Sequence, residues 1–245
     1  MALREEFESS GNWCFRWRSY LPLILLGVIL IGIKDYNPFK SRLINAGWEL
    51  LCFAISLFGL AIRIATVGCA PQGTSGRNTQ SQVADTLNTT GMYSIVRHPL
   101  YLGNFFIWLG ISMFIATWWV SLIIILVFML YYERIMFAEE EFLRKKFGDE
   151  FIAWADATPA FFPEFKNWKP PVLRFSLLNV LRREYSGFFG IIVSFTFLEF
   201  AEDYMACGKV CYKSFWGVVF LGGLAVYLLL RTFKRNTKLL DVEGR

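Results

Sequence analysis

The stretch Gly91–Asn104, GMYSIVRHPLYLGN, marks the point where a polar loop enters a strongly apolar helix, because the run FFIWLGISMFIATWWV follows almost directly. Arg97 and His98 place positive charge at this entry, and Pro99 suits the first turn of a helix. The free N–H groups and the positive dipole end of a helix favour a carboxylate or phosphate. Gly103 allows a neighbouring backbone or a ligand to approach closely. The stretch predicts a cationic binding surface at a membrane helix mouth; an ordinary basic anchor at a helix end is the alternative.

Composition limits the class of protein. The 245 residues are 55% hydrophobic and 18% aromatic, with a mean hydropathy of +0.42, which indicates an integral membrane protein. The net charge of +5 comes from basic residues beside apolar segments, so we expect contact with lipid headgroups and no nucleic-acid partner. The five cysteines lack a C-x-x-C pair and the chain has one histidine, so we expect no metal site.

The predicted fold is an all-α integral membrane protein of about six transmembrane helices with a cytoplasmic cofactor pocket. The apolar runs predict spans over Tyr20–Ile33, Trp48–Gly68, Leu100–Thr117, Trp118–Tyr132, Ser186–Phe200 and Ser214–Leu230. Residues 1–19 are predicted to form a polar N-terminal segment. Pro171–Glu184 alternates apolar residues with arginines, which predicts an amphipathic helix lying on the bilayer.

The chain is predicted to divide into three parts. Residues 1–47 would be an N-terminal segment with the first span, residues 48–170 a core, and residues 171–245 the amphipathic helix with two further spans. If both ends of the Leu100–Tyr132 hairpin face the cytoplasm, 19 of the 25 Lys and Arg residues lie inside. This bias predicts cytoplasmic termini and puts the charged loop and the polar segment 134–170 on one side, where they can form one pocket.

A second informative stretch is Tyr131–Phe151, YYERIMFAEEEFLRKKFGDEF, which is expected to continue the fourth span as a helix. Helical spacing puts Glu139 and Glu140 beside an apolar stripe, so both carboxylates are predicted to face inward. Glu141 instead meets Arg144 and Lys145 and is predicted to be solvated. Buried carboxylates need partners, and the candidates are Arg97, Arg134, His98 or a cationic ligand. A purely structural ion pair is the alternative.

Together these motifs resemble the isoprenylcysteine carboxyl methyltransferase and phospholipid methyltransferase family of membrane enzymes, which use S-adenosylmethionine. The resemblance rests on RHPLYLG at residues 97–103, the Glu139–Glu140 pair, and a trailing proline segment with Pro159 and Pro163. Order, spacing and the intervening hydrophobic hairpin agree over roughly residues 48–165, and the rest of the chain lies outside the resemblance.

The resemblance implies a cofactor held between the RHPLYLG loop and the paired glutamates. The residues it assigns to S-adenosylmethionine are Tyr93, Val96, Arg97, His98, Pro99, Tyr101, Gly103, Glu139 and Glu140. It further implies that Glu140 serves as a base where the nucleophile needs one, and that Arg134 orients an anionic substrate group. The acceptor would be a lipid-like or prenyl-like amphipath in contact with membrane lipids.

Two other functions remain open from the sequence. A membrane reductase of the sterol-reductase type would bind NADPH, but inward carboxylates suit a sulfonium and repel a 2′-phosphate. A non-enzymatic channel or scaffold is the other, but the expected spans carry almost no charge at the midplane, where a transport path needs it. The polar loop 69–88 is a candidate lid or a simple connector, and Cys207 and Cys211 are a candidate disulfide or two free thiols.

Overall fold

The computed structural model describes residues 2–18, 20–35, 42–71, 82, 84–208, 214–242 and 244. Within these residues the chain is helical, which confirms the predicted all-α class for this part of the molecule. The helices are α1 (Leu3–Arg16), α2 (Leu21–Gly32), η1 (Ile33–Asp35), α3 (Arg42–Gly68), α4 (Met92–Ile95), α5 (Pro99–Met113), α6 (Trp118–Phe147), α7 (Asp149–Ala157), η2 (Phe165–Asn167), α8 (Leu177–Cys207) and α9 (Ser214–Asn236). Most of the loop 69–88, and Cys211, lie outside the described residues.

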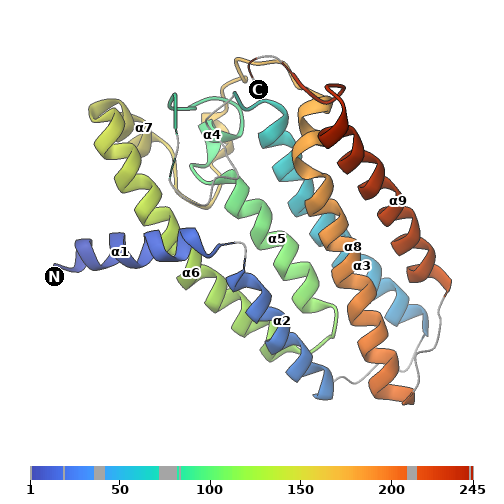
Figure 1. The fold of residues 1–245 in the computed structure, drawn as a ribbon. Helices are drawn as coiled ribbons and strands as arrows, with labels where there is room; N and C mark the ends of the chain where they lie inside the picture. The colour runs from blue at the N-terminus through green and yellow to red at the C-terminus, as the bar shows by residue number, and fades with distance from the viewer. Residues whose placement is uncertain are drawn as a thin grey trace.

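The long helices form a bundle, and one short helix lies across it. α3 packs against both α5 and α8, while α9 packs on the outer side of α8 (Figure 1). α1 crosses the upper half of α6 at a steep angle (Figure 1). The end of α3, the start of α5, the start of α8 and the short α4 all lie at one end of the bundle (Figure 1). This end gathers the segments from which the sequence predicted a pocket.

Among the described residues, three helices are long and apolar enough to cross a membrane: Leu43–Gly68, Trp118–Phe147 and Phe215–Asn236. They correspond to the second, fourth and sixth predicted spans. α5 is apolar but has 15 residues, and α2 has 12, so both are shorter than the roughly 20 residues that a perpendicular span needs. α8, which contains the fifth predicted span, is long enough but is not among the three either, so a count of six spans stays a prediction.

Buried side chains form two hydrophobic clusters. The first occupies the middle of the bundle and includes Phe114, Ile124, Phe195 and Trp216. The second lies beneath the loop of interest and consists of Phe15, Ile95, Val96, Tyr101, Leu102, Phe128, Tyr132, Ile135 and Phe161. Because its members come from α1, α4, α5, α6 and the segment after α7, this second cluster fixes how those elements meet.

The predicted amphipathic helix over Pro171–Glu184 is wrong as a separate element. Residues 171–176 are not helical; α8 begins at Leu177, where the Ser176 side chain accepts a hydrogen bond from the Asn179 N–H, and it runs on for 31 residues. Consecutive prolines disfavour helix before this cap. The apolar and basic residues that suggested a surface helix are thus split between an irregular segment and the first turns of a long helix.

The N-terminal segment is more ordered than its polar composition suggests. Residues 3–16 form α1, which rests on α6 through buried Gly11 and Phe15 and an edge-to-face contact between Phe7 and Phe137. Phe7, Gly11 and Phe15 recur every four residues and therefore share one helix face. This spacing is the signal that identifies α1 in the sequence.

Candidate active site

The loop between α4 and α5 is fixed by the segment that follows α7. The backbone N–H groups of Arg97 and His98 donate to the carbonyls of Pro159 (2.9 Å) and Ala160 (3.2 Å). In return, the Glu164 N–H donates to the Ile95 carbonyl at 2.9 Å. Both chains thus satisfy backbone groups that would otherwise be buried without partners. The trailing segment, through the Pro159 and Ala160 carbonyls and the Glu164 N–H, thus ties the RHPLYLG loop to the end of α7.

His98 lies between the two glutamates that the sequence predicted to face inward. Its Nε2 is 2.9 Å from Glu140 Oε1 and its Nδ1 is 3.6 Å from Glu139 Oε2, while the residue is 7% exposed. Burial lowers the pKa of the imidazole, but the hydrogen bonds and charges of Glu139 and Glu140 outweigh it and leave the pKa of His98 above its ordinary value. The ring is therefore an imidazolium bridge between α5 and α6 over a wider pH range than a free histidine.

Further donors surround the same two carboxylates. The Tyr101 hydroxyl donates to Glu139 Oε1 at 2.6 Å, and Arg18 Nη1 lies 3.7 Å from that oxygen. Arg97 Nε lies 3.1 Å from Glu140 Oε1, and its Nη1 donates to the Ala155 carbonyl at 2.9 Å. The side chains of both glutamates remain 23% exposed. A ligand can therefore reach these carboxylates from outside.

The structure brings five of the predicted site residues into one cluster: Arg97, His98, Tyr101, Glu139 and Glu140. Pro99 opens α5, with His98 as its cap residue, as the motif predicted. Val96 is fully buried beneath the loop, and the Tyr93 carbonyl accepts a hydrogen bond from the Trp154 indole at 3.0 Å. Their roles toward a cofactor stay predictions.

Gly103 makes the close approach to a neighbouring backbone that the sequence predicted, and Arg134 packs on α1; their roles toward a cofactor and a substrate stay predictions. A Cβ on Gly103 would lie 2.5 Å from Arg63 Cγ and 2.7 Å from the Gly59 carbonyl oxygen, so the close approach at this glycine is by α3. Arg134 lies over the Phe7 ring of α1, 3.4 Å from its centroid. Among the described residues, the ion pairs of Glu139 and Glu140 are with Arg18, Arg97 and His98 instead of Arg134.

The prediction that Glu141 is a solvated surface residue is wrong. Glu141 is 5% exposed and accepts two hydrogen bonds from the Arg4 guanidinium of α1, at 2.6 Å and 3.1 Å. Arg144 is only a distant partner at 3.9 Å. Helical spacing within α6 correctly separates Glu141 from its two neighbours, but it contains no information about a helix from the other end of the sequence.

Sequence reasoning missed Arg18 as a member of the cluster. It follows the end of α1 and stacks on Phe15, 4.0 Å from the ring centroid, with 17% of its side chain exposed. Its position depends on α1 packing across α6. The α1 periodicity is therefore also the signal that points to Arg18.

An apolar cavity of about 360 Å³ lies between the end of α3 and the start of α4. It is lined by Ala61, Ile64, Ala65, Cys69, Gly91, Met92, Trp168, Pro171 and Phe175. These residues come from the last turns of α3, the start of α4 and the irregular segment before α8. Such a lining offers almost no hydrogen-bonding groups, so the cavity suits a hydrocarbon chain better than a polar ligand.

Residues 50–150 match the family of phospholipid methyltransferases. Two similar bacterial proteins are the cobalt-zinc-cadmium resistance protein CzcN of Cupriavidus metallidurans and the nickel-cobalt-cadmium resistance protein NccN of Alcaligenes xylosoxydans xylosoxydans. Both are 36% identical to this chain, over 47% and 60% of it and over 51% and 62% of their own lengths.

A third similar protein is the protein-S-isoprenylcysteine O-methyltransferase of Schizosaccharomyces pombe. It is 36% identical over 57% of this chain and 63% of its own length. The chain thus spans about half of the first relative and under two thirds of the other two. No solved structure gives a significant match. These matches confirm the family resemblance predicted from the motifs and, with the three apolar helices, indicate an integral membrane protein.

Proposed function

Because residues 50–150 match the phospholipid methyltransferases, we propose that this chain moves a methyl group from S-adenosylmethionine to a lipid-like or prenyl-like acceptor at the cytoplasmic membrane face. The observation that carries the proposal is the cluster at the RHPLYLG mouth, where two accessible carboxylates meet His98, Tyr101 and Arg97. Paired acids at a membrane-helix mouth are costly unless they have partners or a role.

The residues of this cluster fit the chemistry of S-adenosylmethionine, which carries an ammonium, a sulfonium and a carboxylate. The partly exposed Glu139 and Glu140 suit the cationic groups. Arg97 Nε is buried and, among the described residues, makes no hydrogen bond despite its closeness to Glu140. That N–H would suit the carboxylate of the cofactor. The buried Tyr101 ring, stacked on His98 at 5.7 Å between centroids, holds the imidazole beside the two acids.

When bound, the cofactor supplies an electrophilic methyl carbon for in-line displacement. The task of the protein is then alignment and exclusion of water, and the loop fixed by the segment after α7 meets the first requirement. A carboxylate nucleophile needs no proton removed. An amine or hydroxyl nucleophile needs a base, and Glu140 is the accessible carboxylate whose orientation His98 fixes by a 2.9 Å hydrogen bond.

The apolar cavity supports a hydrocarbon-bearing acceptor. It borders the start of α4, and α3, which supplies three of its lining residues, is one of the helices able to cross a membrane. An acyl or prenyl tail in this cavity would enter from the bilayer, while the cofactor would enter from the cytosol. The sequence match to an isoprenylcysteine methyltransferase is consistent with an acceptor of this kind.

The test is calorimetric titration of the purified protein with S-adenosylhomocysteine and, separately, with NADPH. We expect S-adenosylhomocysteine to bind and NADPH not to bind. Glu140→Gln should weaken binding roughly 10-fold or more, as is typical when a hydrogen bond to a charged group is lost. Glu150→Gln is the matched control, since this acid lies exposed on α7, outside the cluster, and its loss should leave the affinity unchanged.

Three results would contradict the proposal. NADPH binding without S-adenosylhomocysteine binding would favour a reductase. Binding of neither ligand would favour a non-enzymatic membrane protein. Unchanged affinity in Glu140→Gln would remove this carboxylate from the cofactor site.

A further inference from the structure

A buried ion pair between Arg63 and Glu184 joins α3 to α8 next to the candidate site. Arg63 Nε donates to Glu184 Oε2 and Arg63 Nη2 donates to Glu184 Oε1, both at 2.8 Å. The side chains are 18% and 5% exposed. This two-point geometry fixes the guanidinium plane as well as its distance, which a lysine could not do.

The free edge of the same guanidinium continues the connection toward α5 and α6. Arg63 Nη1 donates to Asn104 Oδ1 at 2.7 Å, and Asn104 Nδ2 donates to the Tyr132 hydroxyl at 3.2 Å. Four helices thus contribute one polar side chain each. In an apolar interior such a network has few alternative arrangements, because each broken bond leaves a buried polar group unpaired.

The last member of the network touches the site. The Tyr132 ring lies 4.8 Å from the Tyr101 ring, between centroids, and Tyr101 donates to Glu139 and stacks on His98. The start of α8 is itself held in place, because the Ser176 N–H donates to the Gly68 carbonyl and the buried Asn179 amide donates to the Val67 carbonyl, both at 2.9 Å. Glu184 is therefore presented to Arg63 from a fixed position.

We propose that Glu184 is a positioning residue: through Arg63, Asn104 and Tyr132 it sets the place of Tyr101 and Glu139 in the site. The inference makes α8, which lies outside the matched residues 50–150, a part of the functional unit. It rests on the proposed function for its catalytic meaning. The structural coupling that it describes can be measured without that function.

If the Arg63–Glu184 pair were purely structural, its only role would be to preserve the fold. The test therefore asks whether a variant that still folds has lost the placement of Tyr101 and Glu139. The variant Arg63→Met/Glu184→Leu replaces both charges by apolar side chains, a change that buried pairs often tolerate. Asp241→Asn is the matched control. It removes a different ion pair of α8, the one between Arg182 and Asp241 at 3.3 Å, and this pair lies outside the network. Thermal melting in one detergent shows that each variant folds, and Glu184→Gln is measured as a second, smaller change.

Two readouts follow. The first is calorimetric affinity for S-adenosylhomocysteine, which we expect to fall about 10-fold in the double variant and to stay unchanged in Asp241→Asn. The second is NMR of ¹⁵N-labelled histidine, which gives one pair of ring signals because the chain has a single histidine. We expect the His98 ring signals to shift in the double variant and in Glu184→Gln but to stay unchanged in the control.

A folded double variant with unchanged His98 signals and unchanged affinity overturns the inference. If the wild-type protein binds no S-adenosylhomocysteine, the proposed function fails, and the His98 signals alone then decide the positioning role. If His98 shifts as much in Asp241→Asn as in the double variant, the effect is a general one of α8 and the specific role of Glu184 is excluded.

Discussion

At the residue scale, His98 links the stability of the site to pH. Its pKa is raised above the ordinary value of 6.5 because Glu139 and Glu140 favour the imidazolium. A raised pKa means that the stabilisation is complete below the pKa of the unfolded chain and is lost as pH rises through the higher pKa of the folded protein. We therefore expect the melting temperature of the wild type to fall as pH rises through this range.

His98→Gln provides the comparison. Glutamine retains a hydrogen-bond donor but has no titratable group, so the difference in melting temperature between wild type and variant should shrink as pH rises. The chain has no other histidine, and the remaining titratable groups are the same in both proteins, so their contributions to the melting temperature cancel in the comparison. Parallel curves for the two proteins would show that folding leaves the pKa of His98 unchanged, contrary to the geometry.

At the element scale, the crossing of α3 and α5 depends on glycine. Gly103 and Gly59 face each other across these helices, and a Cβ on Gly103 would lie 2.7 Å from the Gly59 carbonyl oxygen, a backbone atom that cannot move aside. Small residues at such crossings let membrane helices approach closely. We expect Gly103→Ala to cost about 1–3 kcal/mol of stability, as overpacking typically does. Chemical or thermal unfolding in detergent measures the loss.

Gly222→Ala in α9 is the control for this change. A Cβ at that position meets nothing within 4 Å, so the substitution should be neutral or slightly stabilising through helix propensity. Equal effects at the two positions would mean that the helices separate at no cost. Because Arg63 Cγ also borders the site of the added methyl group, Gly103→Ala should additionally weaken ligand binding.

The elements that the sequence predicts well are those specified by local pattern. The span ending at Gly68, the proline start of α5 and the inward turn of Glu139 and Glu140 follow from apolar runs and helical spacing. The misplaced Glu141 depends on a partner far along the chain. Glu141 is buried because Arg4 reaches it across more than a hundred residues, and nothing near Glu141 in the sequence indicates this.

At the scale of the whole molecule, the candidate site is assembled from segments that no single motif contains. Arg18 comes from the N-terminal segment, the RHPLYLG loop from the start of α5 and the glutamates from α6. The proposed network adds Glu184 from α8. The motifs predict the chemistry of the RHPLYLG loop and of the paired glutamates on α6. Long-range packing determines where Arg18, after α1, and Glu184 of α8 join them.

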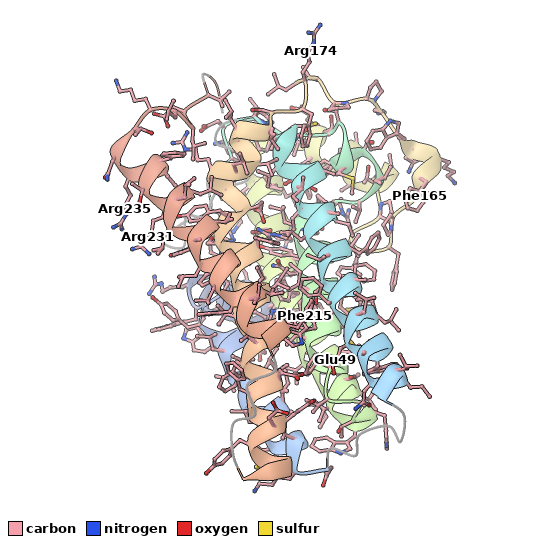
Figure 2. All side chains as sticks on the ribbon, turned by 90° about the vertical axis from the view of Figure 1, so that its right-hand side faces the viewer. Glu49, Phe165, Arg174, Phe215, Arg231 and Arg235 are labelled. Atoms are coloured by element: carbon pink, nitrogen blue, oxygen red, sulfur yellow. The ribbon has the colours of Figure 1, made fainter. Side chains whose placement is uncertain are left out.

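The distribution of basic residues predicts how this assembly sits in the membrane. Figure 2 shows Arg174 at the end of the molecule that carries the loop, and Arg231 and Arg235 pointing outward from the last turns of α9. With 19 of 25 basic residues assigned to that side, we expect the site and both termini to face the cytoplasm. In bacterial expression, a C-terminal green fluorescent protein should then fluoresce, and a C-terminal alkaline phosphatase should be inactive.

The same fusions at the N-terminus test the count of spans. Two cytoplasmic termini require an even number of crossings. If α3, α6, α8 and α9 all cross, the short α2 and α5, with 12 and 15 residues, must therefore either both cross or both fail to cross. Tilting cannot help a short helix, but local thinning of the bilayer can accommodate it at modest cost. Opposite reporter results at the two ends would give an odd number of crossings and so remove one of the six predicted spans. The C-terminal fusion alone would then decide whether the site faces the cytoplasm.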